Sequence, residues 1–237
     1  MNKGIVVSDL HLFSGRSEGY THFEGLADKM AGLDTLVLNG DIFDFRWASS
    51  SHAESIPKAV DWLKELRDEF SHLSIHFIPG NHDCLPGFVE RVENIDGVSL
   101  HSHYLQLGRN LFLHGDAATR RMDRAGFEKF RSSWENDSPR GPTAAQFYRI
   151  ADQLRLTDMV HVTWFGGRKA IRRIGWHLDE VFPGWESEID ACFFGHTHLP
   201  LQGVVDRGVQ FHNTGAGVRG ASFVPIQFHY SPRHENH

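Results

Sequence analysis

The chain has 237 residues, of which 40% are hydrophobic and 23% charged, with a net charge of −6, values typical of a soluble globular protein with one sizeable core. No run of about 18 apolar residues is present, which argues against a membrane-spanning helix. Because the sequence contains only Cys84 and Cys192, and no basic and apolar leader precedes Gly4, we expect no disulfide framework and predict a cytoplasmic protein.

Five short apolar runs, each typical of a buried strand, are followed at once by residues that bind metals. The segments after these runs are Asp9-Leu10-His11, Gly40-Asp41, Gly80-Asn81-His82-Asp83, His114-Gly115-Asp116 and Gly195-His196-Thr197-His198. In layered α/β proteins, ligands bind beyond the carboxyl ends of the strands. The sequence therefore predicts that carboxylates, imidazoles and one amide gather at a single rim.

Two stretches between the first three of these apolar runs have helical patterns. Apolar residues recur at helical spacing from Phe23 to Met30 and from Ala53 to Phe70, so both stretches are predicted to be helices. Strands that alternate with helices are typical of a layered α/β fold.

The stretch 117–188 has a different character. It lacks strand alternation and contains Ser138-Pro139 and Gly141-Pro142, which interrupt regular structure. Thr143 is suited to cap a helix over 144–154, and a second amphipathic stretch covers 156–174. We expect these helices to pack over the rim.

Strand character returns after residue 188. The predicted strands are 189–194, 202–205, 209–212 and 223–229, and Asp206-Arg207-Gly208 predicts a hairpin turn between the second and third of them. We therefore assign residues 1–116 and 189–237 to one core and residues 117–188 to a helical cap insertion.

Basic residues are concentrated in the insertion. From Arg120 to Trp176 there are 12 Lys and Arg against 6 Asp and Glu, whereas the rest of the chain has 12 against 24. This asymmetry indicates either a phosphorylated partner or a solvated helical face. The candidate substrate-binding residues are Arg120, Arg121, Arg168, Lys169 and Arg172. Because the body is acidic and an extended basic track is missing, we expect no nucleic-acid partner.

The ligand types suit two divalent cations. Asp9 and His11 are two apart, and so are His196 and His198, so in an extended backbone each pair would lie on one face. One cation would take Asp9, His11 and His198. The other would take Asn81, His114 and His196, with Asp41 as the bridge between the two. Mixed carboxylate, imidazole and amide ligands favour Mn²⁺, with Fe or Zn²⁺ as alternatives. Two cations about 3.5–4 Å apart would hold a phosphoryl group and activate a hydroxide.

His82 follows the ligand Asn81, so we predict that it faces the substrate and donates a proton to the leaving oxygen. Asp83 is predicted to orient His82 by a hydrogen bond. Asp44 and Asp116 follow ligand segments, and we expect them to lie just outside the ligands.

Together these segments resemble the calcineurin-like metallophosphoesterase superfamily, whose pattern is Asp-x-His, Gly-Asp, Gly-Asn-His-Asp/Glu, a late His and Gly-His-x-His. All five are present here in that order. The resemblance implies an α/β fold, namely a four-layer αββα sandwich with a helical insertion, and a dinuclear centre that hydrolyses a P–O bond.

Some segments are similar to the UDP-2,3-diacylglucosamine hydrolases of lipid A synthesis. They are 8–12, 40–44, 113–116 and 125–131. This similarity implies a lipid-linked pyrophosphate substrate and an insertion that shelters acyl chains. Whether the protein makes peripheral membrane contact is left open. The acyl-binding candidates are Trp134, Phe147, Tyr148, Leu154, Met159, Val160, Trp164 and Phe165.

One position departs from those hydrolases, which typically carry Arg after the ligand Asn, where this chain has His82. His at this position is the general superfamily pattern, associated with phosphate mono- and diesterases. The alternative function is therefore a phosphodiesterase or phosphatase acting on a soluble nucleotide or sugar phosphate. A scaffold without catalysis, as in the retromer subunit of this fold, is less favoured because every ligand is kept. The sequence predicts no oligomeric state.

Overall fold

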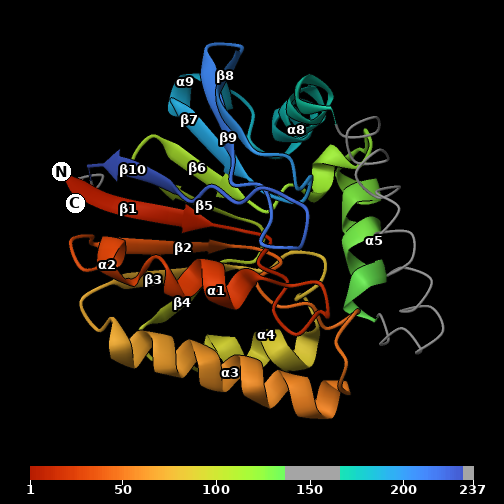
Figure 1. The fold of residues 1–237 in the computed structure, drawn as a ribbon. Coiled ribbons are helices and arrows are strands. Elements are labelled where there is room, and N and C mark those ends of the chain that lie inside the picture. The colour runs from red at the N-terminus through yellow and green to blue at the C-terminus, as the bar shows by residue number, and fades with distance from the viewer. Residues whose placement is uncertain (137–165, 232–237) are drawn as a thin grey trace.

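The computed structural model describes residues 1–136 and 166–231, and its centre consists of two five-stranded sheets that face each other (Figure 1). The first sheet has the order β10-β1-β2-β3-β4. Its strands are β1 Asn2–Val7, β2 Thr35–Asn39, β3 Ser74–Ile78, β4 Val98–Leu100 and β10 Ile226–Tyr230. Strands β1 to β4 are parallel and β10 is antiparallel to β1, so β1, β2 and β3 all end on the same side.

The second sheet has the order β5-β6-β7-β9-β8. Its strands are β5 Tyr104–Leu107, β6 Asn110–Leu113, β7 Ala191–Phe194, β8 Leu201–Asp206 and β9 Val209–Asn213. The central strands β6, β7 and β9 are parallel, whereas β5 and β8 pair antiparallel at the edges. The carboxyl ends of β6 and β7 therefore also meet on one side.

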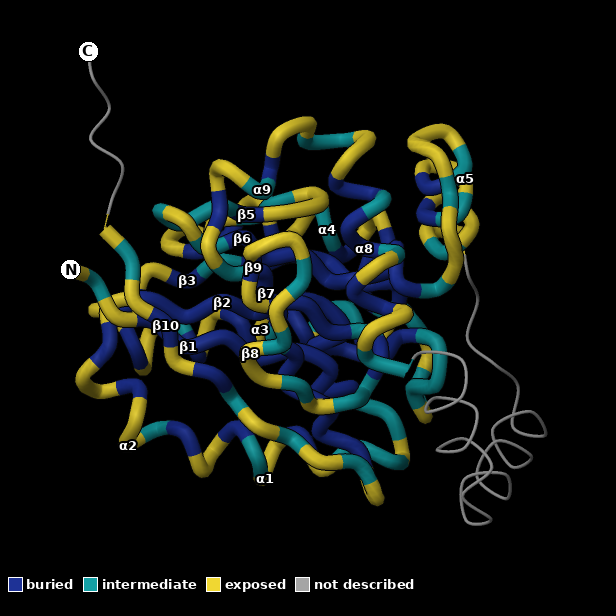
Figure 2. The backbone as a smooth tube through the Cα atoms, turned by 90° about the horizontal axis from the view of Figure 1, so that it is seen from above, coloured by how far each residue is buried: buried dark blue, intermediate teal, exposed yellow. Residues whose placement is uncertain are grey.

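Three layers of apolar side chains hold the sheets and helices together, and the buried strands form the dark centre of Figure 2. Val6, Phe112, Phe193 and Phe228 are among the residues buried between the two sheets. A second layer lies between the first sheet and helices α1 to α4, and a third lies beneath helix α8. This arrangement is an αββα sandwich, which confirms the predicted fold class.

The helices of the first half are α1 Gly19–Glu24, α2 Ala27–Met30, α3 His52–Glu69 and α4 Pro86–Glu93. The predicted helix at 53–70 is confirmed as α3. It begins at a capping box, in which the Ser51 backbone N–H donates to the Glu54 carboxylate at 3.1 Å. Its buried residues, which include Ala59, Leu63 and Leu66, recur at the spacing of one helical face.

The prediction of one helix from Phe23 to Met30 is wrong. The chain turns between α1 and α2, where the N–H of Leu26 bonds to the carbonyl of Phe23 at 2.9 Å instead of continuing the α-helical ladder. Gly25 stands at this point, and glycine has a low helix propensity.

The last predicted strand, 223–229, is displaced. Strand β10 spans Ile226–Tyr230, because Pro225 has no N–H to donate to a sheet ladder. Phe223 instead forms an isolated bridge with Gly215. The other late strands match their predictions, and the hairpin turn has left-handed backbone at Arg207 (φ 50°) and Gly208 (φ 84°), as tight hairpins require.

The described part of 117–188 forms helices. They are η1 Asp116–Ala118, α5 Arg124–Glu135, α8 Gly167–Val181 and α9 Trp185–Glu188. Helix α5 lies across the side at which the strands end (Figure 1), while α8 buries Ala170, Ile171 and Ile174 on the outer face of the second sheet. The helix predicted at 144–154 lies outside the described residues, and the division into core and cap stays a prediction.

Within the described ranges 1–136 and 166–231, no helix is both long enough and apolar enough to cross a membrane.

Candidate metal centre

The five ligand-bearing loops meet where β1, β2, β3, β6 and β7 end. Backbone hydrogen bonds lock the loops to one another: the N–H of Asp9 donates to the Gly40 carbonyl at 3.0 Å, and the N–H of Gly195 donates to the His114 carbonyl at 2.7 Å. The N–H of His196 also donates to the Asp9 carboxylate at 2.9 Å. The last bond joins the two sheets, so the metal-binding segments of both come together at one rim.

Asp9, His11 and His198 form the first group of potential metal ligands. His11 Nε2 lies 3.0 Å from His198 Nε2 and 4.0 Å from Asp9 Oδ1, and His198 Nε2 lies 3.4 Å from Asp9 Oδ1. Asp9 and His11 are buried. One carboxylate oxygen and two imidazole nitrogens thus converge on a space of the size that one cation needs.

Asp41, His114 and His196 form a second group. Asp41 Oδ2 lies 3.3 Å from His114 Nε2, and the amide oxygen of Asn81 lies 2.9 Å from His196 Nδ1 and 3.4 Å from His114 Nε2. The same Asp41 Oδ2 is 3.9 Å from His11 Nε2 of the first group. Asp41 therefore stands between the two groups, in the position of a bridging carboxylate.

In three of the imidazoles one ring nitrogen faces these groups, and the other ring nitrogen contacts a residue outside them. The outer contacts are His11 Nδ1 with Asp44 Oδ2 at 3.3 Å, His114 Nδ1 with the Asn39 carbonyl at 3.2 Å, and His196 Nε2 with Thr119 Oγ1 at 2.8 Å. Such outer partners fix the ring orientation of metal-binding histidines.

The loop backbone is left-handed at most of these residues, so the prediction of extended backbone for Asp9 to His11 and His196 to His198 is wrong. The φ angles are 54° at Asp9, 49° at His11, 52° at Asp41, 65° at His196 and 56° at His198. Non-glycine residues rarely adopt this conformation, which costs energy and is concentrated at functional sites. The turn aims side chains of neighbouring loops at one point.

Two glycines of the motifs are required by close approach. A Cβ atom on Gly80 would lie 2.2 Å from Asp41 Oδ1, and a Cβ atom on Gly195 would lie 2.2 Å from Asp9 Oδ2. Both distances are far below van der Waals contact, so any side chain at these positions would displace a carboxylate of the site.

The site concentrates negative charge. Burial by itself would raise the pKa of Asp41, but the positive charges of His114 and His82 outweigh it and hold that pKa well below its usual value. For His114 the balance is reversed: burial opposes its charge, yet the carboxylates of Asp41 and Asp116 raise its pKa to about 10. Ionised carboxylates in a buried place favour bound cations.

The surroundings of Asp116 show whether a cation fits at this site. Its Oδ1 is buried and has no hydrogen-bond partner within the part of the chain that the structure describes, although buried polar atoms are almost always paired. This oxygen lies 3.8 Å from both His114 Nε2 and His196 Nδ1. A cation beside these imidazoles would satisfy it. The donor set thus fits two divalent ions.

Arg131 of α5 holds the other oxygen of Asp116. This arginine is 7% exposed, and its Nη1 donates both to Asp116 Oδ2 and, at 3.2 Å, to the Pro79 carbonyl, just before the Gly80 segment. Its Nη2 donates to the Ser102 carbonyl at 3.3 Å. Arg131 therefore connects α5 to two of the ligand-bearing loops.

His82 is oriented by Asp44 and not, as the sequence predicted, by Asp83. His82 Nδ1 lies 2.9 Å from Asp44 Oδ1, so its Nε2 remains for a substrate. Burial by itself would lower the pKa of His82, but the charges of Asp44 and Asp41 raise it to about 9. Its side chain is 16% exposed, so His82 stands at the edge of the site.

Asp83 binds backbone N–H groups and not the His82 ring. Its buried carboxylate accepts backbone N–H groups at 2.6–3.3 Å, and the donors are Asp41, Ile42, Phe43 and Gly80. Burial and the neighbouring charge of Asp41 raise its pKa to about 7. Asp83 thereby fastens the loop after β2 to the loop after β3.

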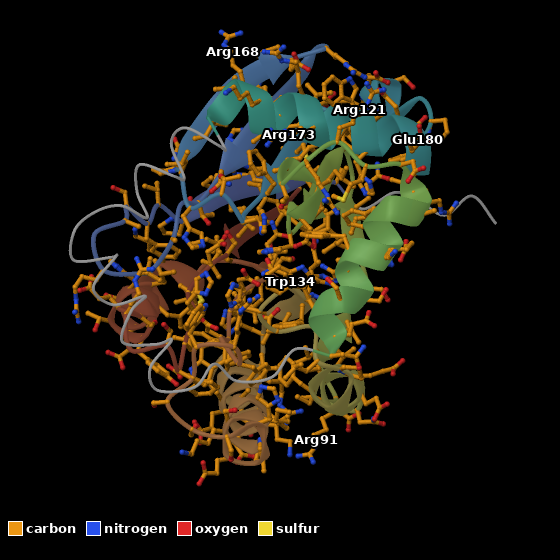
Figure 3. The ribbon with its side chains drawn as sticks, turned by 90° about the vertical axis from the view of Figure 1, so that its right-hand side faces the viewer. Arg91, Arg121, Trp134, Arg168, Arg173 and Glu180 are labelled. Carbon is orange, nitrogen blue, oxygen red and sulfur yellow. The ribbon has the colours of Figure 1, made fainter. Side chains whose placement is uncertain are left out.

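Of the predicted substrate-binding residues, Arg120 and Arg121 follow η1, next to the His114 segment, and the other three lie on α8. Arg120 lies 5.7 Å from the ring of Phe130, and Arg121 lies 4.6 Å from the ring of Trp176. Arg168, Lys169 and Arg172 are exposed on α8. Figure 3 shows Arg168 at the outer end of this helix, pointing away from the strands.

Sequence reasoning missed Arg46, which lies near His82. Its guanidinium carbon is 4.5 Å from the ring of Trp134, which is itself 6.0 Å from the ring of His82. The available signal was that Arg46 belongs to the same segment as Asp41 and Asp44. Trp134 is described, while the other acyl-binding candidates lie outside the described residues.

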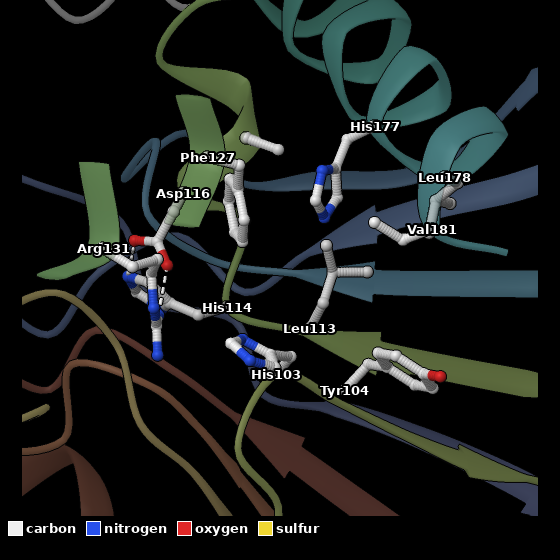
Figure 4. A pocket seen from close by; sticks show the side chains of 12 residues that line it. His103, Tyr104, Leu113, His114, Asp116, Phe127, Arg131, His177, Leu178 and Val181 are labelled. Carbon is white, nitrogen blue, oxygen red and sulfur yellow. Dashed lines mark hydrogen bonds and ion pairs between the residues drawn. The ribbon is translucent and has the colours of Figure 1, made fainter. Parts of the chain in front are cut away.

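A small cavity of about 20 Å³ lies behind the site, between α5, α8 and β5 to β6 (Figure 4). Its lining includes Phe127, Arg131 and His177 together with His114 and Asp116. This volume is about that of one water molecule, so it is a packing feature and not a substrate pocket.

Comparison with known proteins places this geometry among phosphoesterases. Residues 4–200 match the family described as "Calcineurin-like phosphoesterase". A search of curated proteins finds no match.

Three solved structures illustrate the likeness. The phosphopantetheinyl hydrolase of Mycobacterium tuberculosis is 16% identical, with 97% of this chain and 96% of that chain covered and a TM-score of 0.45. The phosphoesterase Yfce of E. coli is 15% identical, with 92% and 82% covered and a TM-score of 0.43. Vps29 of Entamoeba histolytica, solved with Zn²⁺, is 14% identical, with 93% and 77% covered and a TM-score of 0.39.

Proposed function

This chain belongs to the calcineurin-like phosphoesterase family, and we propose that it hydrolyses a phosphoric ester or pyrophosphate bond at a two-metal centre. The observation that carries the proposal is the pair of ligand groups that share Asp41, whose Oδ2 is 3.3 Å from His114 Nε2 and 3.9 Å from His11 Nε2. Asp9, His11 and His198 would hold one ion. Asn81, His114 and His196 would hold the other.

Divalent ions in such a pair polarise phosphoryl oxygens and make a water molecule nucleophilic near neutral pH. Mn²⁺ is our preferred metal because carboxylate, imidazole and amide ligands suit it, with Fe or Zn²⁺ as alternatives.

His82 supplies the proton that the leaving oxygen needs. Burial opposes the positive charge of this imidazole, but Asp44 and Asp41 raise its pKa, which favours the protonated ring. Asp44 fixes the Nδ1 side at 2.9 Å, and the Nε2 proton is therefore the one available for donation.

The substrate that we favour is a pyrophosphate of the UDP-2,3-diacylglucosamine type, used in lipid A synthesis. The segments at 8–12, 40–44, 113–116 and 125–131 support it, and Trp134 beside His82 offers an apolar surface near the reacting bond. Peripheral contact with a membrane would give access to such a substrate. Arg120, Arg121, Arg168, Lys169 and Arg172 are the candidates for binding its anionic groups.

One observation favours a soluble phosphodiester or phosphomonoester instead. His82 occupies the position at which the lipid hydrolases typically carry Arg, and its hydrogen bond with Asp44 at 2.9 Å suits an acid that protonates an alcohol or phenol. A role as a non-catalytic scaffold is less favoured because the complete ligand groups are kept.

The test is hydrolysis of UDP-2,3-diacylglucosamine and bis-p-nitrophenyl phosphate, side by side, by the Mn²⁺-loaded protein. The Asp41→Asn variant serves as the blank. We expect turnover that needs metal and is lost in the variant. A strong preference for the lipid supports the lipid A role, whereas activity on the diester alone overturns that role and keeps the two-metal hydrolase. Inactivity on both would favour the scaffold.

A further inference from the structure

Arg46 and Trp134 form a wall beside His82, and neither residue belongs to the two groups of potential metal ligands. Arg46 follows the loop that carries Asp41 and Asp44, and Trp134 comes from α5, at a distance of 88 positions in the chain. The guanidinium carbon of Arg46 lies 4.5 Å from the centre of the Trp134 ring, within the range of a cation–π contact. The Trp134 ring lies 6.0 Å from the His82 ring, tilted by 36°.

This wall faces the opening of the site. His82 is 16% exposed and His198 18% exposed, whereas Asp9 is fully buried, so a substrate reaches the metal-binding groups past these two imidazoles. In Figure 3, which views the side at which the strands end, Trp134 lies near the middle of the molecule and Arg168 at its upper edge. Through its contact with Trp134, Arg46 lies on the same side of the opening as His82.

The Trp134 indole adds a second polar group to the wall. Its Nε1 is buried and has no hydrogen-bond partner among residues 1–136 and 166–231. A buried donor without a partner is unfavourable, and an acceptor on a bound ligand would satisfy it. Arg46 and Trp134 together thus present a cation, an N–H donor and a flat ring.

From this juxtaposition we propose that Arg46 binds an anionic leaving group, and that the substrates are pyrophosphate diesters in which a phosphate monoester departs past His82. The inference rests on the proposed function, because it takes His82 to stand at the leaving oxygen. An alcohol leaving group is neutral once protonated and needs no cation beside His82. A departing phosphate keeps its charge, which a fixed guanidinium binds well.

The reaction conserves atoms and charge as an ordinary hydrolysis. The oxygen of a water molecule forms a bond to one phosphorus, and the bond from that phosphorus to the bridging oxygen breaks. The electron pair of the broken bond stays on the bridging oxygen, which leaves as part of a phosphate monoester. His82 gives this oxygen a proton, and the proton released by the water molecule replaces it through solvent.

The test compares Arg46→Gln with wild type on substrates that differ in their leaving group. UDP-2,3-diacylglucosamine and UDP-glucose both release a phosphate monoester, and using two of them removes dependence on the acyl chains. Bis-p-nitrophenyl phosphate releases a phenolate that carries no phosphate. Arg91→Gln, which removes an exposed charge from α4 far from the rim (Figure 3), is the matched control.

We expect Arg46→Gln to lower kcat for the cleaved pyrophosphate by roughly 10- to 100-fold, the value of one charged hydrogen bond. KM should change less than kcat, since the charge develops as the bond breaks. Hydrolysis of the diester should change by less than about threefold. Arg46→Lys should restore part of kcat on the pyrophosphate, because it returns the charge, and Arg91→Gln should behave as wild type.

Other outcomes separate the two proposals. If wild type cleaves the diester but neither pyrophosphate, or if Arg46→Gln loses activity equally on both classes, the leaving-group role of Arg46 is wrong and the two-metal hydrolase stands. If wild type cleaves none of the three substrates, the proposed function itself fails. Should Arg46→Gln not fold, as judged by circular dichroism, the comparison of Arg46→Lys with wild type decides in the same way.

Discussion

At the scale of single residues, Asp44 is the most consequential group outside the metal-binding sets. Its two oxygens contact two imidazoles, His11 Nδ1 at 3.3 Å and His82 Nδ1 at 2.9 Å. It therefore orients both an expected metal ligand and the expected proton donor. Its pKa is lowered, because the positive charge of His82 and the hydrogen bonds with His11 and His82 outweigh the effect of burial, and it remains ionised at neutral pH.

Replacing Asp44 by Asn should lower kcat by roughly 10- to 100-fold, as expected for the loss of an orienting carboxylate. The carboxylate raises the pKa of His82, so its removal lets that pKa fall and the proton donor is lost at lower pH. The alkaline limb of the pH–kcat profile should therefore move to lower pH. Asp68→Asn, at an exposed carboxylate, is the control. An unchanged alkaline limb would contradict the role given to Asp44.

A second residue-scale prediction concerns His177 in the small cavity. Burial lowers its pKa to about 4, and its ring centre lies 4.1 Å from that of Phe127. A histidine whose pKa is lowered by folding takes up a proton more easily when unfolded. The free energy of unfolding should thus fall as pH drops from about 6.5 toward 4, by on the order of 1–3 kcal/mol from this residue.

Urea unfolding at pH 7.5 and pH 5 measures this effect. His177→Phe, which cannot titrate, should lose less stability than wild type between the two pH values. Other buried histidines with lowered pKa values, such as His76, contribute to both proteins and cancel in the comparison. Equal losses in the two proteins would show that His177 does not titrate in this range.

Among the helices and strands, α5 is the helix that is fixed to the ligand-bearing loops. It begins at Asp123, whose carboxylate accepts the N–H of Gly126 at 2.8 Å. It is then anchored by Arg131, which contacts Asp116, the Pro79 carbonyl and the Ser102 carbonyl. The same helix carries Trp134, so the anchor also sets the position of the wall beside His82.

Replacing Arg131 by Met should lower the free energy of unfolding by about 3–5 kcal/mol, since it leaves the Asp116 carboxylate buried without its partner. It should also weaken Mn²⁺ binding, because Asp116 Oδ1 would no longer be held 3.8 Å from His114 Nε2 and His196 Nδ1. Calorimetric titration with Mn²⁺ measures the affinity. Lys129→Met, at an exposed position of α5, is the control. Wild-type affinity in the Arg131 variant would contradict this coupling.

At the scale of the whole molecule, the candidate metal centre is a joint between two sheets. Asp9, Asp41 and Asn81 follow strands of the first sheet, and His114, His196 and His198 follow strands of the second. Ions held by both sets would connect the sheets directly. They would also neutralise carboxylates that otherwise repel one another in a buried place.

Metal should therefore stabilise the entire fold. At a free Mn²⁺ concentration one hundred times the Kd, binding to the folded state alone adds about 2.7 kcal/mol. Thermal unfolding in Mn²⁺ and in EDTA measures the shift, and Asp41→Asn should reduce it because that carboxylate faces both groups. A Tm that is the same in Mn²⁺ and EDTA would mean that the folded protein does not bind this ion.

The strands of the site and the ligand segments that follow them could be predicted from sequence alone, and the family resemblance implied the sandwich. Each ligand segment follows a short apolar run, and both the strand and its polar end are local properties of the chain, so β1, β2, β3, β6 and β7 and the residues after them could be predicted. The capping box and spacing of α3 are local in the same sense. These features need only neighbouring residues to be recognised.

The arrangement of those residues could not be predicted from the sequence. The left-handed backbone at Asp9 and His11, the pairing of His82 with Asp44 instead of Asp83, and the approach of Arg46 to Trp134 all depend on contacts between distant segments. Sequence order gives no distance for such pairs. A left-handed loop is unfavourable by itself and persists only because residues from other strands hold it. These residues come together only when the two sheets pack against each other.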